Sequence, residues 1–217
     1  MALDVSGLDR AEELAASCAP HVGMLKVGLE LFWACGPDAV RAIATHAPVF
    51  ADAKLHDIPN TVERAAANIG RLGVAMLNVH ALGGEQMMRA AIRGAERAAE
   101  ETGRERALVL AVTVLSSHAG EGLASPASLA FEARAAGLDG VVVSGEDVED
   151  VRTVCGEEFC LAVPGIRPAG SNGDDQVRVL TPVAAQEKGA DYLILGRPVI
   201  DASDPPAVLR SIRSQLR

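Results

Sequence analysis

Long apolar runs are missing from this sequence of 217 residues, because charged residues interrupt every stretch. None reaches the ~18 residues that a membrane helix needs. Positive charge is also in the minority, with Lys+Arg 20 against Asp+Glu 29 and a formal net charge of -9. A general nucleic-acid binder or a polybasic membrane binder needs a field of basic residues, so both classes are excluded. Because the chain also opens without a basic and then apolar leader, we expect a cytoplasmic protein.

The usual metal, disulfide and dinucleotide signatures are missing as well. The four cysteines form no CxxC pair, and the five histidines form no HxH or HExxH arrangement. A chain of this length does not need disulfides to fold, so we expect reduced thiols and no histidine metal site. The glycine-rich GxGxxG turn of dinucleotide-binding open sheets does not occur either.

Short apolar runs do alternate with longer amphipathic stretches along the whole chain, and 49% of the residues are hydrophobic. Such runs are typical of strands buried on both faces of a parallel sheet. The predicted strands are Ala2–Val5, Gly23–Val27, Val49–Ala53, Val74–Val79, Leu108–Leu115, Gly140–Val143, Leu161–Val163 and Tyr192–Leu195. The predicted helices are Leu8–Cys18, Asp38–His46, Asn60–Leu72, Glu85–Glu100, Ala127–Ala136, Glu146–Val154, Pro182–Lys188 and Pro205–Leu216. This alternation, without a linker, predicts a single α/β domain over residues 1–217, a (β/α)8 TIM barrel, with an open doubly wound sheet as the alternative.

Lysine is scarce, since only Lys26, Lys54 and Lys188 occur among the 20 basic residues. A (β/α)8 barrel carries its active site at the carboxyl ends of its strands. Asp4, Lys26 and the pair Asp52 and Lys54 each end a predicted strand. Residues two apart in a strand face the same side, so Asp52 and Lys54 are predicted to point into the barrel mouth, where Lys26 can pair with Asp52.

Alternating acids and bases at one mouth suit a particular kind of chemistry. Each charge offsets the desolvation cost of its neighbour, so both kinds stay ionised. The array fits the removal of a carboxylate from a ring carbon: Asp52 crowds the departing group and Lys54 supplies the proton that replaces it. We therefore expect a decarboxylase centred on these two side chains.

A phosphate site is predicted at the last two strand ends. Gly165, Gly196 and Arg197 follow the seventh and eighth predicted strands, where barrels often bind phosphate. Backbone amides near glycines and one guanidinium hold an anion well. The polar segment 169–176 would close over the phosphate as a flap and add the amide of Gln176; the alternative is an ordinary surface loop.

The segment from Asp52 to Thr61, which reads DAKLHDIPNT, resembles the DxKxxDIPNT signature of the orotidine 5'-phosphate decarboxylase family. The resemblance extends over most of the chain. Further matching segments follow in family order: Ala2–Asp4, Lys26–Gly28, Asn78–Ala81, Val112–Ser117, Pro164–Pro168, Asp175–Gln176 and Gly196–Pro198.

This resemblance implies decarboxylation of orotidine 5'-monophosphate to UMP and CO2, the last step of de novo pyrimidine synthesis, without a metal or cofactor. Lys54 would protonate the ring carbon, with Asp52 against the substrate carboxylate. Lys26 would hold Asp52 and the ribose, and Asp4 would bind the ribose hydroxyls.

The remaining contacts implied by the resemblance are to the base, the phosphate and a second subunit. Ser116, or in its place Ser117, would contact the pyrimidine, and Pro164 would pack near it. Gln176, Gly196 and Arg197 would hold the phosphate. The family completes its site across a homodimer, so Asp57, Ile58 and Thr61 would serve the partner subunit's site.

Two other functions are compatible with the same barrel. A metal-dependent sugar-phosphate decarboxylase or aldolase would keep the Asp/Lys array, but Ile58–Thr61 and Asp175–Gln176 favour the nucleotide enzyme. A non-catalytic nucleotide-binding barrel would not need the complete array, which is present here.

Overall fold

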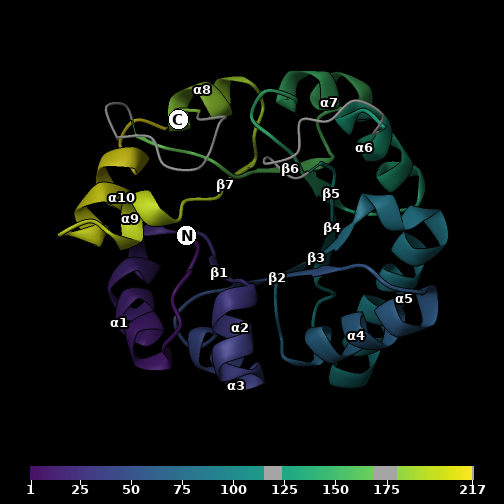
Figure 1. Ribbon diagram of the computed structural model, residues 1–217, viewed down its shortest axis with the longest axis horizontal. Helices are drawn as coiled ribbons and strands as arrows, with labels where there is room; N and C mark the ends of the chain where they lie inside the picture. The colour runs from purple at the N-terminus through teal and green to yellow at the C-terminus, as the bar shows by residue number, and fades with distance from the viewer. Residues whose placement is uncertain (115–123, 169–179, 217) are drawn as a thin grey trace.

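The computed structural model describes residues 1–114, 124–168 and 180–216. Its sheet consists of parallel strands that lie side by side in sequence order and curl around a central axis (Figure 1). Strand order along the sheet equals sequence order, as it does when each strand is followed by a helix that returns the chain to the next strand. The strands are β1 Leu25–Val27, β2 Val49–Leu55, β3 Met76–His80, β4 Leu108–Val112, β5 Gly140–Val142, β6 Cys160–Val163 and β7 Tyr192–Leu193.

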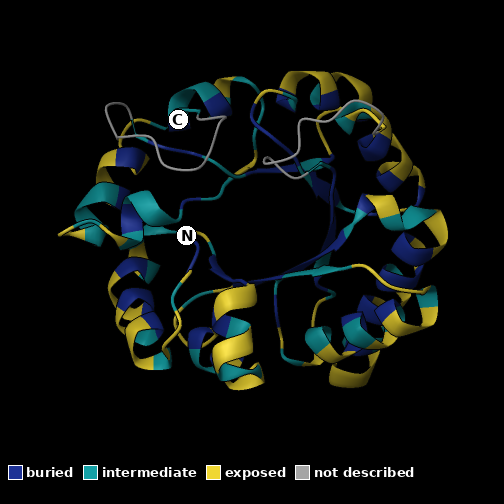
Figure 2. Cartoon of the chain, in the orientation of Figure 1, coloured by how far each residue is buried: buried dark blue, intermediate teal, exposed yellow. Residues whose placement is uncertain are grey.

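Helices surround this sheet, with their exposed residues on the outer side of the ring (Figure 2). They are α1 Leu8–Cys18, α2 Leu29–Cys35, α3 Pro37–Ile43, α4 Pro59–Arg71, α5 Gly84–Thr102, α6 Pro126–Ala135, α7 Val148–Cys155, α8 Pro182–Glu187, α9 Arg197–Ile200 and α10 Pro205–Arg213, with 3-10 turns η1 Ala19–His21 and η2 Ala81–Gly83. Several helices start with proline, whose fixed φ suits a first turn. Among the described residues, no helix is both long and apolar enough to cross a membrane.

The predicted first strand, Ala2–Val5, is reduced to a single parallel bridge between Ala2 and Lys26. The N–H of Ala2 donates to the carbonyl of Leu195 at 2.7 Å, and the N–H of Leu3 donates to the carbonyl of Lys26 at 3.0 Å. The amino-terminal segment thus lies between β1 and the residues after β7 and joins the two edges of the sheet. The barrel prediction is confirmed, with a short seam in place of a full eighth strand.

Two helices were not predicted from the sequence. Both α2 and α9 are short, and α2 exposes Leu29 and Trp33, so its apolar residues do not show the inward periodicity of a packed helix. The predicted helix Asp38–His46 begins one residue earlier and ends at Ile43. The last residue of the predicted fifth strand, Leu115, lies outside the described residues.

Alternate residues of each strand face the barrel axis, and these side chains change character along it. Phe50, Met76, Leu110 and Ala162 form one buried apolar cluster inside the sheet, while the main core packs between the sheet and the helices. Two residues after Phe50 on β2 comes Asp52, and two after Met76 on β3 comes Asn78. The interior is therefore apolar toward the amino-terminal ends of the strands and polar toward their carboxyl ends.

Arginine–aspartate pairs join neighbouring strands at the amino-terminal end of the barrel. Asp139, just before β5, accepts hydrogen bonds from both terminal nitrogens of Arg106, at 2.8 and 2.6 Å, and from the N–H of Val109 on β4 at 2.7 Å. Asp191, just before β7, accepts from Arg152 and from the N–H of Leu161 on β6, each at 2.7 Å. Each carboxylate thus satisfies a backbone donor of the preceding strand.

We predict that Asp139→Ala lowers the free energy of unfolding by about 1–3 kcal/mol, because it leaves the buried N–H of Val109 without its acceptor. Urea unfolding followed by circular dichroism measures the effect. Glu132→Ala, which removes an exposed carboxylate from α6, is the matched control and should leave the midpoint within error. Equal midpoints for both variants would show that the Asp139 contacts do not stabilise the barrel.

Candidate active site

Four charged side chains form a continuous chain at the carboxyl ends of the first strands. The Nζ of Lys26, from β1, lies 3.2 Å from Oδ1 of Asp4 and 3.0 Å from Oδ2 of Asp52 on β2. The Nζ of Lys54 donates to Oδ1 of Asp52 at 2.5 Å. Asp52 therefore lies between two ammonium groups. We call Asp4, Lys26, Asp52 and Lys54 the charged array.

Burial and mutual attraction compete in this array. Lys26 and Asp52 are each only 9% exposed. Burial alone would raise the pKa of Asp52, but the charges of Lys26 and Lys54 and the hydrogen bonds to Asp52 lower it to about 2. Burial would likewise lower the pKa of Lys26, but the carboxylates of Asp52 and Asp4 raise it above its usual value. Asp52 and Lys26 are consequently both charged at neutral pH.

The backbone around Lys54 departs from a regular strand. Lys54 has φ +48°, and it is the one non-glycine residue with a positive φ in the described parts of the chain. The register between β2 and β3 shifts between Ala51 and Leu55, so a bulge lies at this position. The N–H of Lys54 donates to Oδ1 of Asn78, and Nδ2 of Asn78 donates to Oδ1 of Asp52, each at 2.7 Å.

Two glycines leave room for the array. A Cβ atom at Gly28 would lie 3.0 Å from Nζ of Lys26 and 3.2 Å from Oδ1 of Asp4. A Cβ atom at Gly196 would lie 3.3 Å from Oδ2 of Asp4. A larger residue at either position would crowd the polar atoms of Asp4 or Lys26.

All four residues of the array line a cavity of about 270 Å³ at this end of the barrel. The rest of the lining includes groups that suit an anion and an aromatic ring: Ser144, Pro164, Gly165, Arg167, Gly196 and Arg197. The structure thus brings Asp4, Lys26, Asp52 and Lys54 into one cavity with Pro164, Gly196 and Arg197. The cavity offers two guanidinium groups for an anionic group and the Lys54 ammonium for a reacting carbon.

Arg167 is a cavity residue that was not predicted from the sequence. Its side chain lines the same space as Arg197, although the residue is only 5% exposed. The available signal was its place in the matching segment Pro164–Pro168, directly after a strand. One arginine was expected at the mouth of the barrel, whereas both Arg167 and Arg197 line the cavity there.

Three predicted residues lie outside this cavity and two lie outside the described residues. Asp57, Ile58 and Thr61 are exposed around the start of α4, where Oδ1 of Asp57 accepts from the N–H of Ile58 at 2.7 Å. Ser116 and Gln176 fall within the undescribed ranges 115–123 and 169–179.

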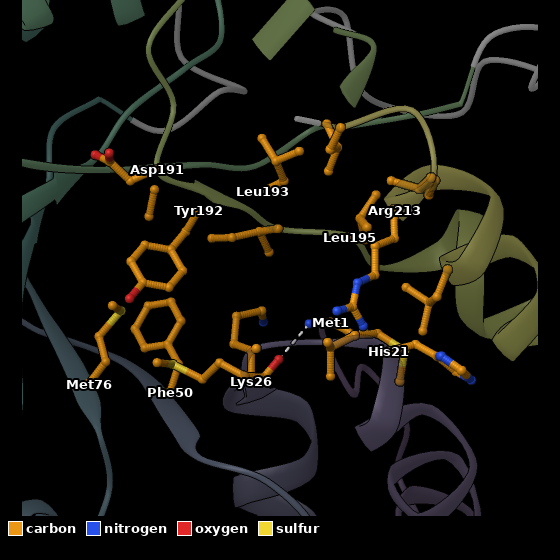
Figure 3. A pocket seen from close by; sticks show the side chains of 18 residues that line it. Met1, His21, Lys26, Phe50, Met76, Asp191, Tyr192, Leu193, Leu195 and Arg213 are labelled. Atoms are coloured by element: carbon orange, nitrogen blue, oxygen red, sulfur yellow. Dashed lines mark hydrogen bonds between the residues drawn. The ribbon is translucent and has the colours of Figure 1, made fainter. Parts of the chain in front are cut away.

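A second, larger cavity of about 480 Å³ lies toward the amino-terminal ends of the strands. Its labelled side chains include Phe50, Met76, Tyr192 and Leu193, with His21 and Arg213 at its side toward α10 (Figure 3). This lining is mainly apolar, and of the charged array it includes only Lys26. The chemistry of the lining, not the volume, therefore identifies the candidate active site.

Comparison with known proteins identifies the family of the chain. Residues 1–212 match the model of the orotidine 5'-phosphate decarboxylase / HUMPS family. The orotidine 5'-phosphate decarboxylase of Anaeromyxobacter sp. (strain K) is 48% identical over 226 residues, which cover 99% of this chain and 96% of that protein. The Moorella thermoacetica enzyme of the same name is 46% identical over 228 residues, covering 100% of this chain and 90% of that protein.

Solved structures show the same likeness. The crystal structure of orotidine 5'-phosphate decarboxylase from Lactobacillus acidophilus superposes with a TM-score of 0.86 at 34% sequence identity, covering 100% of this chain and 97% of that chain. A barrel from Geobacillus kaustophilus, described as an uncharacterized conserved protein, has a TM-score of 0.84 at 31% identity over 100% of this chain and 98% of that chain. Fold and sequence agree over the full length, and the chain belongs to the orotidine 5'-phosphate decarboxylase / HUMPS family.

Proposed function

We propose that the charged array carries out the reaction of this carboxy-lyase, the decarboxylation of orotidine 5'-monophosphate to UMP and CO2 in UMP biosynthesis. The observation that carries the assignment of roles is the Asp52 carboxylate held between two ammonium groups, with two arginines lining the same cavity. The family membership supports the substrate, and the contacts of each side chain support its part in the reaction.

Asp52 destabilises the bound substrate relative to the transition state. The substrate carboxylate lies beside the ionised carboxylate of Asp52, and two like charges ~4 Å apart repel by about 4 kcal/mol at an effective dielectric near 20. This repulsion accelerates the reaction because it is relieved as the carboxylate becomes neutral CO2. Lys26 and Lys54 hold Asp52 in place and keep it ionised. The Asp52 carboxylate therefore stays negatively charged, and its repulsion of the substrate carboxylate persists.

Lys54 supplies the proton. The bond between the ring carbon and the carboxylate breaks, its electron pair stays on the ring carbon, and that carbon takes a proton from the Lys54 ammonium. The product is UMP, and the neutral amine of Lys54 then regains a proton from water. The side chain of Lys54 is 29% exposed in the cavity, so water can reach it once the product leaves.

The remaining cavity residues bind the nucleotide. Asp4 and Lys26 contact the ribose hydroxyls, and Pro164 packs near the base. Gly196 and Arg197 hold the phosphate, with Arg167 as a second guanidinium in the same space. By the family resemblance, Ser116 contacts the pyrimidine and Gln176 the phosphate.

The enzyme acts as a homodimer in this proposal, with Asp57, Ile58 and Thr61 completing the partner subunit's site. Large apolar side chains are exposed just after neighbouring strands: Leu29 (44%) after β1, Ile58 (65%) after β2 and Leu82 (47%) after β3. Trp33 on α2 is 80% exposed, and α2 is conspicuously exposed in Figure 2. Apolar groups gathered near one end of a barrel are typical of a protein–protein interface.

Purified protein in excess EDTA is expected to convert orotidine 5'-monophosphate to UMP, followed by the change in ultraviolet absorbance. Lys54→Ala should lower kcat by at least ~100-fold, because it removes the proton donor. Lys188→Ala is the control with unchanged kcat, since Lys188 pairs with Glu149 on the outer helices at 3.3 Å.

Other results of this assay would redirect the assignment. If orotidine 5'-monophosphate is not converted and a sugar phosphate is converted only after Mg²⁺ is added, the result would support a metal-dependent sugar-phosphate enzyme. UMP binding without turnover would support a non-catalytic barrel. Near-normal turnover by Lys54→Ala would exclude Lys54 as the proton donor.

Mixing inactive Asp57→Ala and Lys54→Ala proteins is expected to restore activity to about a quarter of the wild-type value. When equal amounts are combined, half of the dimers contain one subunit of each variant. Each of these dimers has one undamaged site out of two, which gives a quarter of the wild-type activity. The control mixture of Asp52→Ala and Lys54→Ala should stay inactive, because both changes damage the same subunit's side of a site. No recovery in the first mixture, with subunit exchange shown by native mass spectrometry, would refute the shared site.

Arg197→Ala should raise the KM for orotidine 5'-monophosphate by about 10–100-fold, because a charge-assisted hydrogen bond to phosphate is lost. Initial rates over a range of substrate concentrations measure the change. Arg210→Ala, on the solvent side of α10, is the control and should leave KM unchanged. An unchanged KM for Arg197→Ala would place the phosphate elsewhere.

A further inference from the structure

We propose that Asn78 is a positioning residue that fixes the carboxylate of Asp52 and the backbone of Lys54 relative to each other, and so controls the rate of the chemical step. The inference rests on the roles proposed above for Asp52 and Lys54. Asn78 lies on β3, next to the strand that carries both residues, and it is fully buried.

The contacts of Asn78 determine which side chain fits there. Its Oδ1 accepts from the N–H of Lys54, and its Nδ2 donates to Oδ1 of Asp52, each at 2.7 Å. A backbone N–H can only donate, and an ionised carboxylate can only accept. A carboxamide offers an acceptor and a donor side by side, whereas a hydrocarbon side chain offers neither and an ionised carboxylate only acceptors.

The backbone of Lys54 needs this support because it is strained. A positive φ costs a non-glycine residue ~1–2 kcal/mol, and Lys54 adopts φ +48° at the bulge between β2 and β3. The bulge interrupts the regular ladder, and the side chain of Asn78 gives the Lys54 N–H the acceptor that it would otherwise lack. Without that acceptor the segment can relax and carry the ammonium group away from its place against Asp52.

The position of Asn78 separates its effect on rate from any effect on binding. Asn78 is fully buried and is not among the residues that line the active-site cavity, so its effect is expected to pass through Asp52 and Lys54. A displacement of ~1 Å in a catalytic group can cost about 100-fold in rate while substrate contacts elsewhere remain. Loss of Asn78 should consequently lower kcat and leave KM nearly unchanged.

Asn78→Leu keeps the approximate size of the side chain and removes both hydrogen bonds. We expect kcat to fall by about 10–100-fold, with the KM for orotidine 5'-monophosphate and the Kd for UMP within about threefold of wild type. Thr113→Val is the matched control, because Thr113 is also buried beyond the end of a neighbouring strand and donates to the carbonyl of Val142 at 3.2 Å. That variant should keep the wild-type kcat.

Asn78→Asp provides a test with a distinct pH signature. A protonated carboxyl group at this position can donate its O–H to Asp52 and accept from the Lys54 N–H, as the carboxamide does. Lys26 and Lys54 keep Asp52 ionised, so the introduced group takes the proton, and repulsion from Asp52 raises its pKa above the ordinary ~4. The kcat of Asn78→Asp relative to wild type should rise as pH falls through that pKa.

Other titratable groups nearby are common to all the variants. His80 follows on the same strand, with its ring centroid 5.4 Å from that of His56, and burial, His56 and Lys54 lower the pKa of His80. Asp4 and Lys26 complete the surroundings of Asp52. Because each kcat is divided by the wild-type value at the same pH, ionisations present in both proteins cancel. The ratio for Asn78→Leu should be independent of pH.

The outcomes separate this inference from the proposed function. A wild-type kcat for Asn78→Leu, a defect confined to KM, or a ratio for Asn78→Asp that does not change with pH would overturn the role of Asn78. If Asn78→Leu does not fold, Asn78→Asp still decides, since high and low pH are compared in one protein. Retained turnover in Lys54→Ala would instead refute the proposed function.

Discussion

The geometry of the barrel mouth depends on the ion pairs and hydrogen bonds made by one buried carboxylate, that of Asp52. Asp52 on β2 receives an ammonium group from β1, a second ammonium group from its own strand and an amide N–H from β3. Burying a carboxylate is costly unless such partners offset the loss of water. The same contacts lock three neighbouring strands together at their carboxyl ends. The contacts of Asp52 therefore both stabilise its negative charge and fix the geometry of the site.

Lysine and arginine are used for different purposes in this chain. The compact ammonium of Lys26 contacts two carboxylates at once, those of Asp4 and Asp52, inside the cavity. The planar guanidinium of Arg106 instead binds Asp139 with two parallel hydrogen bonds at the other end of the barrel. A point charge that can release a proton suits the reactive end, and a rigid fork that stays charged suits the structural end.

The features that follow from hydrophobic periodicity and from the residues at strand ends were predicted from the sequence. The alternation of apolar runs predicted the barrel, and the scarcity of lysine directed attention to Lys26 and Lys54. The contacts of Asn78 were not predicted, because they depend on the register of β2 against β3 and on the backbone angle of Lys54. The reduction of the first strand to a bridge was missed for a similar reason, since pairing at the seam depends on residues at the far end of the chain.

The seam has a consequence for how the protein acquires activity. Each other pair of adjacent strands is close in sequence, but the bond from Ala2 to Leu195 joins the two ends of the chain. Contacts between such distant residues cost the most loop entropy and tend to form late in folding. Asp4 and Arg197, which both line the cavity, come two residues after Ala2 and Leu195, the residues that this bond joins. A newly made chain can thus possess most of its sheet and still lack an active site, which is completed only when the ring closes.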